Sequence, residues 1–210
     1  MNQMLSDIEK NIAERQDTDR RMWFSMWILL SFVTFGAAWF LMIYYLIKRR
    51  NEHFERQKKL EVLILNRFRQ VSNEKSPELA KSIVTDSDGK NSQDSRNAVG
   101  WAASTVLILP TFYVLRFLMD DLVKHEEHEA AFLREVSSFA KGLGLSMNIE
   151  NAAMTAKSVT LTRYLTLTAG SIGLAGFYWL YRIFNDYNRH FKRQWRFEDE
   201  LLRVLKSAET

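Results

Sequence analysis

The sequence contains no cysteine and only two prolines and eight glycines among its 210 residues. Without cysteine, the chain can form no disulfide, offer no thiolate nucleophile and build no cysteine-ligated metal site. It also has no glycine-rich phosphate loop, and no nucleophile–base pair or pair of catalytic carboxylates stands out. The sequence therefore indicates a protein that is not an enzyme, and it predicts no cofactor.

Charged residues are absent from 26 consecutive positions, 22–47. One continuous helix of that length would rise roughly 39 Å, which exceeds a hydrocarbon core of about 30 Å. Tryptophans near one end of this stretch and tyrosines near the other are typical of the interfacial belts of membrane helices. Two further apolar stretches, 99–119 and 159–184, complete a prediction of three membrane spans, the second kinked at Pro110.

A charged segment with apolar residues at helical spacing follows each predicted span, which indicates that each span continues as an amphipathic tail. The predicted fold class is all-α: an integral membrane protein with three transmembrane helices and three helical tails. The expected units are a polar N-terminal arm (1–21), a first span and tail (22–70), a flexible linker (71–98), a second span and tail (99–144), a connection (145–158) and a third span and tail (159–210).

The distribution of charge predicts an orientation for these spans. Residues 48–98 contain 12 Lys/Arg and 8 Asp/Glu, whereas residues 120–158 contain 4 and 7. Because basic loops stay in the cytoplasm, the first loop and the C-terminal tail are expected on the cytoplasmic side of the cell membrane. The N-terminus is expected on the outer side. Three successive crossings then place the second, acidic tail outside.

A threefold repeat links the span–tail junctions. Segments 41–61, 113–133 and 178–198 align on histidine, and three of the four histidines of the chain occupy the equivalent place. Repeated units of this kind usually pack against one another. The equivalent junction residues singled out are His53, Arg56, His125, His190 and Arg193. The repeat itself would suit three tails in one compartment, but the acidic second tail favours alternation.

The first and third junctions, YYLIKRRNEHFERQ and YWLYRIFNDYNRHFKRQ, carry a family resemblance. The chain resembles a family of small uncharacterised prokaryotic multi-span membrane proteins, classed as a domain of unknown function. The resemblance covers about a third of the chain and departs most at the second junction, where His128 and Glu129 replace Arg-Gln. It implies a membrane location and repeated units, and it implies no reaction, ligand or catalytic residue.

The repeat histidines suggest two metal-binding hypotheses. His125, His128 and Glu129 share one helical face, and imidazole with carboxylate suits zinc or similar ions, although the string HEEHE lacks the H-E-x-x-H spacing. The interpretation that the sequence favours over this site is a solvated charged face, with the histidines at a lipid-headgroup or helix–helix interface. A haem held between His53 and His190 would require the first and third tails to pack together.

Small residues form a stripe in the third predicted span and favour close helix packing: Ala169, Gly170, Gly173 and Gly176. The function expected is therefore a non-enzymatic membrane scaffold or accessory subunit. The alternatives are an oligomeric channel or transporter component, and a metal- or haem-binding protein using the repeat histidines. The expected partners are the lipid bilayer and either a second copy or another membrane protein. No nucleic acid is expected, because the positive-inside rule already explains the basic runs.

Overall fold

The structure is a computed structural model that describes residues 3–75, 95–147, 156 and 160–207. Every regular element in these residues is an α-helix, so the all-α prediction is confirmed. Two helices at the N-terminus precede three pairs, each pair a short helix followed by a long one. In chain order the elements are α1 (Gln3–Ala13), α2 (Arg15–Thr18), α3 (Phe24–Val33), α4 (Ala37–Lys75), α6 (Ala98–Ser104), α7 (Ile108–Gly142), α8 (Leu161–Gly170) and α9 (Leu174–Ser207).

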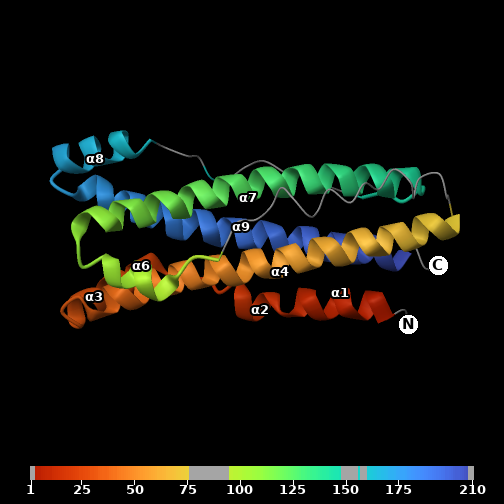
Figure 1. Ribbon diagram of the computed structural model, residues 1–210, viewed down its shortest axis with the longest axis horizontal. Helices are drawn as coiled ribbons and strands as arrows, with labels where there is room; N and C mark the ends of the chain where they lie inside the picture. Colours follow the sequence, from red (N-terminus) through yellow and green to blue (C-terminus); the bar gives the residue numbers. More distant parts are fainter. Residues whose placement is uncertain (1–2, 76–94, 148–155, 157–159, 208–210) are drawn as a thin grey trace.

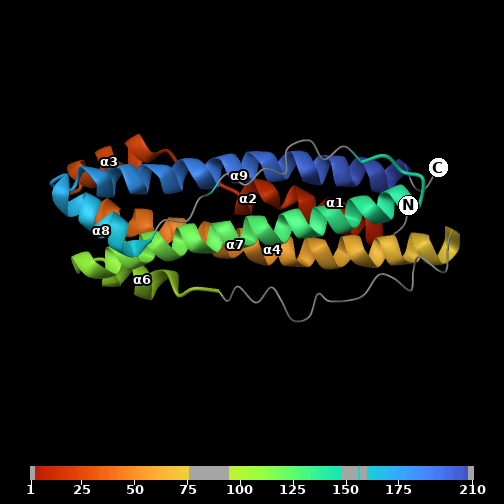
Figure 2. The same cartoon turned by 90° about the horizontal axis from the view of Figure 1, so that it is seen from above.

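The three long helices, α4, α7 and α9, run side by side in the same direction (Figures 1 and 2). Their N-terminal halves share one hydrophobic cluster and their C-terminal halves share another. Each short helix folds back at the N-terminal end of its long helix, so α3, α6 and α8 gather at one end of the molecule, the hairpin end. Helix α1 lies at the other end, the tail end, where Leu5, Ile8 and Ile12 are buried.

Tight turns separate the short and long helices of the first and third pairs. Phe35 and Gly36 have φ of 49° and 92°, and Ile172 and Gly173 have 53° and 90°. The Gly36 N–H donates to the Ser31 carbonyl at 2.7 Å, and Gly173 does the same to Thr168 at 2.8 Å. A hydrogen bond from a backbone N–H to the carbonyl five residues earlier, next to a residue of left-handed conformation, is a typical helix end. Glycine is favoured at the left-handed position.

A hydroxyl before each turn starts the next helix. The Thr34 and Ser171 hydroxyl oxygens each accept a bond from the backbone N–H four residues later, on Ala38 and Ala175, both at 2.9 Å. The two turns thus have the same backbone shape and the same side-chain support. Because the turn interrupts both the 22–47 and the 159–184 stretches, neither forms one continuous helix.

The second pair breaks at the equivalent place, between α6 and α7. Pro110 lies in the first turn of α7. A first-turn N–H has no partner within the helix, so proline loses no hydrogen bond there. The predicted kink in the middle of a span is therefore wrong.

The predicted membrane spans are contradicted. Of the helices in the described part of the chain, none combines the length and the apolar character needed to cross a membrane. The physical reason is the three turns, which divide each apolar stretch, together with the charged residues that begin at Lys48 in α4. Because the spans are contradicted, the predicted multi-pass location in the cell membrane is not supported either. That prediction places the N-terminus outside and the C-terminus in the cytoplasm. The predicted alternation of the tails is not supported, since the three long helices are parallel.

The small-residue stripe of 159–184 lies at the hairpin formed by α8 and α9. A β-carbon added at Gly170 or Gly173 would meet no atom within 4 Å, and Gly173 supplies the turn between α8 and α9. At Gly176 a β-carbon would lie 3.2 Å from the Thr168 methyl group. Ala169 is exposed. The stripe therefore shapes one hairpin, with Gly176 allowing α8 to approach α9.

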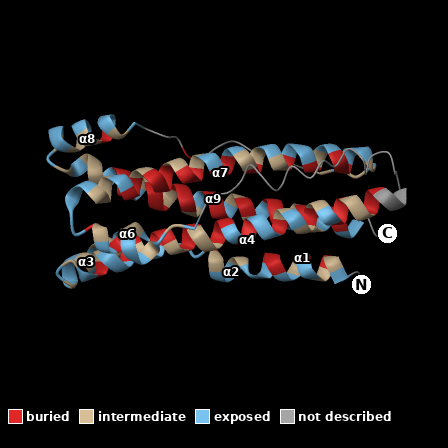
Figure 3. Ribbon diagram, in the orientation of Figure 1, coloured by how far each residue is buried: buried red, intermediate tan, exposed pale blue. Residues whose placement is uncertain are grey.

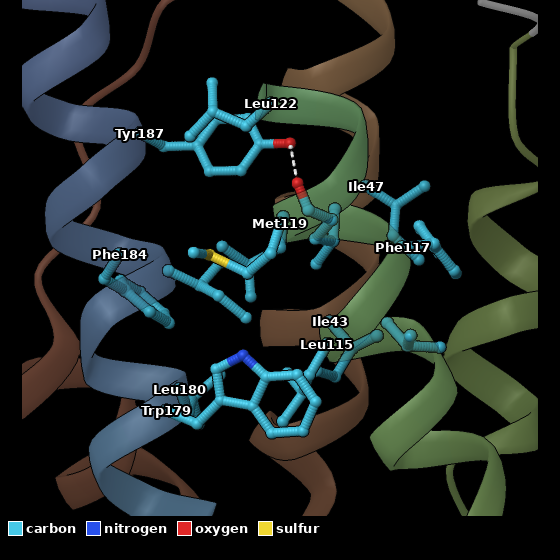
Figure 4. Packing of buried hydrophobic residues seen from close by; sticks show 14 of the residues in the cluster. Ile43, Ile47, Leu115, Phe117, Met119, Leu122, Trp179, Leu180, Phe184 and Tyr187 are labelled. Carbon is cyan, nitrogen blue, oxygen red and sulfur yellow. Dashed lines mark hydrogen bonds between the residues drawn. The ribbon is translucent and has the colours of Figure 1, made fainter. Parts of the chain in front are cut away.

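Two apolar clusters hold the bundle together (Figure 3). In the cluster nearer the hairpin end, Trp179, Phe184 and Ile43 from α9 and α4 pack against Leu115 from α7 (Figure 4). The Tyr187 hydroxyl donates to the Leu118 carbonyl oxygen at 2.9 Å (Figure 4). The second cluster joins the tails to α1. Between the two clusters lies a buried layer of charged and polar side chains.

Of the units expected from the sequence, the linker 71–98 falls largely on 76–94, and the connection 145–158 largely on 148–155, which lie outside the described residues. Residues 71–75 belong to α4, and residue 98 begins α6. The polar arm 1–21 supplies α1 and α2.

Candidate metal centre

The three repeat histidines meet in the polar layer between the clusters. His53 comes from α4, His125 from α7 and His190 from α9, and each is buried. Because the three long helices are parallel and carry the same sequence repeat, equivalent positions come to the same height in the bundle. The repeat predicted the equivalence of these residues, and the parallel packing brings them into contact.

The geometry of the three rings is close to threefold. The ring centroids are 5.1 Å apart for His53–His190 and 5.2 Å for each of the two pairs with His125. One ligand nitrogen from each ring lies within 4.8 Å of the other two. The Nε2 atoms of His53 and His190 are 3.1 Å apart. The three imidazoles therefore converge on a common point.

Carboxylates contact the Nδ1 atoms of two of the rings. Asp19 Oδ1 lies 2.8 Å from His53 Nδ1, and Glu126 Oε1 lies 3.3 Å from His190 Nδ1. An Nδ1–H that donates to a carboxylate leaves Nε2 with its lone pair, which is the arrangement around metal-binding histidines. The third ring stacks on Phe54 at 4.2 Å, and its Nε2 has no hydrogen-bond partner within the described residues. A buried nitrogen without a partner is costly unless something else satisfies it.

Burial favours the neutral form of two of the three rings. It lowers the pKa of His125 well below 6.5, with the neighbouring histidines adding to the shift. Burial also lowers the pKa of His190 to about 4, although the hydrogen bond to Glu126 opposes it. A neutral imidazole offers a lone pair to a metal ion, whereas a protonated one does not.

Two arginines near the rings pair with carboxylates. Arg56 lies 2.9 Å from Asp19 and 2.8 Å from Glu198. At the equivalent place in the third repeat, Arg193 lies 2.9 Å from Glu126 and 3.5 Å from Glu129. Each arginine thus bridges two carboxylates, and one carboxylate of each bridge also contacts a histidine ring.

The carboxylates of these bridges differ in their proton affinity. Burial opposes ionisation of Asp19, but the charges of His53 and Arg56 more than offset it and lower its pKa. At Glu129, burial raises the pKa to about 8, although Arg193 works against that shift.

Only part of the metal set predicted from the sequence comes together. His125 belongs to the centre, and Glu129 is buried beside it, 3.8 Å from His190 Nδ1. His128 turns away to Glu61, at 2.9 Å. For haem, the 3.1 Å between the Nε2 atoms of His53 and His190 leaves no room for a porphyrin plane.

Sequence reasoning missed the contributions of Asp19, Glu126 and Glu198. Asp19 follows α2 in the polar arm, where nothing in the local pattern distinguishes it from the neighbouring acids. Glu126 takes the place held by Phe54 and Phe191 in the other repeats. That substitution of a carboxylate for an aromatic residue was a usable signal, because it falls next to the histidine.

The pair of His128 and Glu61 predicts a pH-dependent contribution to stability. The hydrogen bond to Glu61 raises the pKa of His128, although partial burial opposes it. The pair therefore stabilises the fold fully below about pH 6.5, the pKa in the unfolded chain, and its contribution is lost as the pH rises through the folded pKa. We expect the destabilisation caused by His128→Gln, measured by urea unfolding, to be larger at about pH 5.5 than at about pH 8.5. An equal effect at both would contradict the assignment.

Comparisons with known proteins give no family for the chain: no family model, curated protein or solved structure matches it. The resemblance to small multi-span membrane proteins therefore stays a prediction.

Proposed function

We propose that this protein binds a divalent transition-metal ion of the zinc class, with His53, His125 and His190 as the ligands. The observation that carries the proposal is the convergence of three buried imidazoles, with ligand nitrogens within 4.8 Å of one another, from three different helices. The unpartnered Nε2 of His125 supports it, because a metal ion would satisfy that nitrogen.

The chemistry of the donor set limits the choice of ion. Imidazole suits zinc, copper, iron and nickel, whereas magnesium and calcium take oxygen ligands. In a tetrahedral site with Zn–N bonds of about 2.0–2.1 Å, neighbouring nitrogens lie about 3.3–3.4 Å apart. The 3.1 Å between the His53 and His190 nitrogens is close to that spacing.

The role we assign to the ion is to join the three long helices and fix their register. The centre is closed, with each histidine at most 3% exposed. Closed sites are typical of structural metal ions, whereas catalytic zinc keeps a position open to substrate. A non-enzymatic role follows.

Of the functions expected from the sequence, this proposal corresponds to the metal-binding protein that uses the repeat histidines. It does not include haem. The scaffold and channel hypotheses drew on membrane-crossing helices and on a continuous small-residue stripe, whereas the histidine hypothesis has a specific geometry to support it. In the competing interpretation, the histidines are a metal-free polar layer that sets helix register through hydrogen bonds.

The test compares His125→Phe with His128→Phe after the protein has been stripped with EDTA. Phenylalanine at 125 keeps the stacking on Phe54 and removes the ligand, while the same change at 128 leaves the centre intact. We expect wild type and His128→Phe to bind one Zn²⁺ or Co²⁺ per chain by calorimetry and elemental analysis, and His125→Phe to bind none.

Metal binding should also stabilise the wild-type protein. At free Zn²⁺ of about 100 times Kd the gain is about 2.7 kcal/mol, which corresponds to a rise in Tm of about 5–10 °C for a domain of this size. The proposal is wrong if stripped wild type takes up no Zn²⁺, Co²⁺ or Ni²⁺, or if a folded His125→Phe binds them as tightly.

A further inference from the structure

The hairpin end presents apolar side chains outward. At the turns, Phe35 is 100% exposed and Ile172 is 95% exposed. In the second hairpin, Ile108 and Leu109 are 76% and 74% exposed. The exposed positions lie on all three hairpins, and Figure 3 shows exposure spread over α3, α6 and α8. An apolar surface shared by three elements at one end of a molecule marks an interaction site.

The backbone conformation at these turns indicates that the exposed apolar side chains make a contact outside the chain. Phe35 and Ile172 adopt positive φ, which is rare for a bulky residue and rarer for a β-branched one. Glycine or asparagine would make the same turn with less strain, and either would suit water better. A strained residue that keeps a fully exposed apolar side chain is therefore in place for a contact outside the chain.

The dimensions and the distribution of apolar side chains fit lipid. Helices α3 and α8 each have 10 residues. Each therefore rises about 15 Å, which is half of a hydrocarbon core of about 30 Å. Helix α3 has no charged residue and none of its residues is buried, so apolar side chains face outward around much of it. A protein partner covers one face, whereas lipid chains can surround a hairpin.

A basic and aromatic rim borders the apolar end. One groove there is lined by Arg21, Trp23, Tyr178, Arg182, Arg189 and Lys192, together with a tyrosine and two asparagines. No carboxylate lines this groove, although Asp186 pairs with two of its arginines from behind. A second groove is lined by Arg20, Lys48 and Tyr45, but Asp17 and Glu52 also line it and pair with these two cations, so the first groove supplies the basic part of the rim. Tryptophan and tyrosine favour the membrane interface, and Lys/Arg clusters attract anionic headgroups.

We propose that the hairpin end inserts into one leaflet of an anionic lipid bilayer, with the metal centre and the tail end outside it. The turns of the three hairpins reach the acyl chains, and the rim binds headgroup phosphates. No helix crosses the membrane in this arrangement. The proposal is independent of the metal site, which lies deeper in the bundle.

The test is binding of the full chain to vesicles of phosphatidylcholine and phosphatidylglycerol, measured by co-flotation. We expect wild type to bind, and to bind pure phosphatidylcholine less tightly. The double variant Phe35→Asp with Ile172→Asp should weaken partitioning by about 100-fold or more, since two large apolar side chains lose their lipid contact. Aspartate accepts positive φ more readily than phenylalanine or isoleucine, so folding should survive, as circular dichroism would verify.

The matched control is Val62→Asp, an exposed apolar residue of α4 beyond the histidine layer, at 42% exposure. It should bind vesicles like wild type. Insertion depth can be read from single cysteines, because the chain has none of its own. A polarity-sensitive fluorophore at Phe35→Cys should shift to the blue on vesicles, and one at Val62→Cys should not.

Two results would overturn the proposal. One is vesicle binding by the double variant equal to that of wild type. The other is a wild-type protein that ignores vesicles but forms an oligomer which the double variant dissociates, since the apolar end would then contact a second copy.

Discussion

Replacing Asp121 with alanine is expected to lower the free energy of unfolding by about 3–5 kcal/mol, because the change leaves a buried arginine without its carboxylate. Asp121 lies 2.9 Å from Arg50, whose side chain is only 1% exposed. It also accepts bonds from Arg96 at 2.7 and 2.9 Å. Burial lowers the pKa of Arg50, with the Asp121 charge opposing that shift. Two arginines therefore share this one carboxylate.

The neighbouring residue is the matched control. Asp120 pairs with Arg116 one turn away on the same helix, at 3.1 Å, and both side chains are partly exposed. Such surface pairs contribute about 0–1 kcal/mol. Chemical unfolding of Asp121→Ala and Asp120→Ala should therefore differ by at least about 2 kcal/mol. An equal loss of unfolding free energy in the two variants would mean that other groups stabilise Arg50 and Arg96 when Asp121 is removed.

Trp179→Ala is expected to destabilise the protein by about 3–5 kcal/mol, as large-to-small changes of buried tryptophan do. Trp179 is fully buried and stacks on Tyr164, with ring centroids 3.4 Å apart and planes 2° from parallel. This contact ties α8 to α9. Loss of the indole removes its contacts with the surrounding side chains and leaves a cavity that a bundle of packed helices can fill only in part.

Trp23→Ala provides the comparison for this change, because Trp23 is 67% exposed. Exposed substitutions are usually within about 0.5 kcal/mol of neutral. Denaturant unfolding followed by circular dichroism measures both variants in the same way. A Trp179→Ala protein as stable as Trp23→Ala would show that α8 is not packed on α9 as described.

Sequence alone could predict the helical content and the repeat, because both are local patterns. The equivalence of His53, His125 and His190 was visible once the junctions were aligned. Their meeting point was not visible, because it depends on the three long helices running in parallel. The charge distribution favoured alternating directions, which separate the second tail from the other two. The zinc hypothesis was therefore built within one helix, from His125, His128 and Glu129, and the haem hypothesis joined only the first and third tails.

The membrane spans were wrong for a related reason. Twenty-six positions without charge are long enough for a span, and hydropathy does not register the turn at Phe35 and Gly36. A signal was nevertheless present in the repeat: TFGAA at 34–38 and SIGLA at 171–175 stand at the same distance from their histidines. A hydroxyl residue, an apolar residue, a glycine and an alanine two positions later recur in both, and together they make the turn.

The most direct test of the three-histidine centre is X-ray absorption spectroscopy on the Zn²⁺-loaded, full-length protein. We predict three imidazole nitrogens at about 2.0–2.1 Å from the metal, with the outer-shell scattering of histidine rings. The same spectrum from His125→Phe should lose that signature. A metal ion surrounded only by oxygen atoms, or by one imidazole, would contradict the assignment of the three histidines as a single centre.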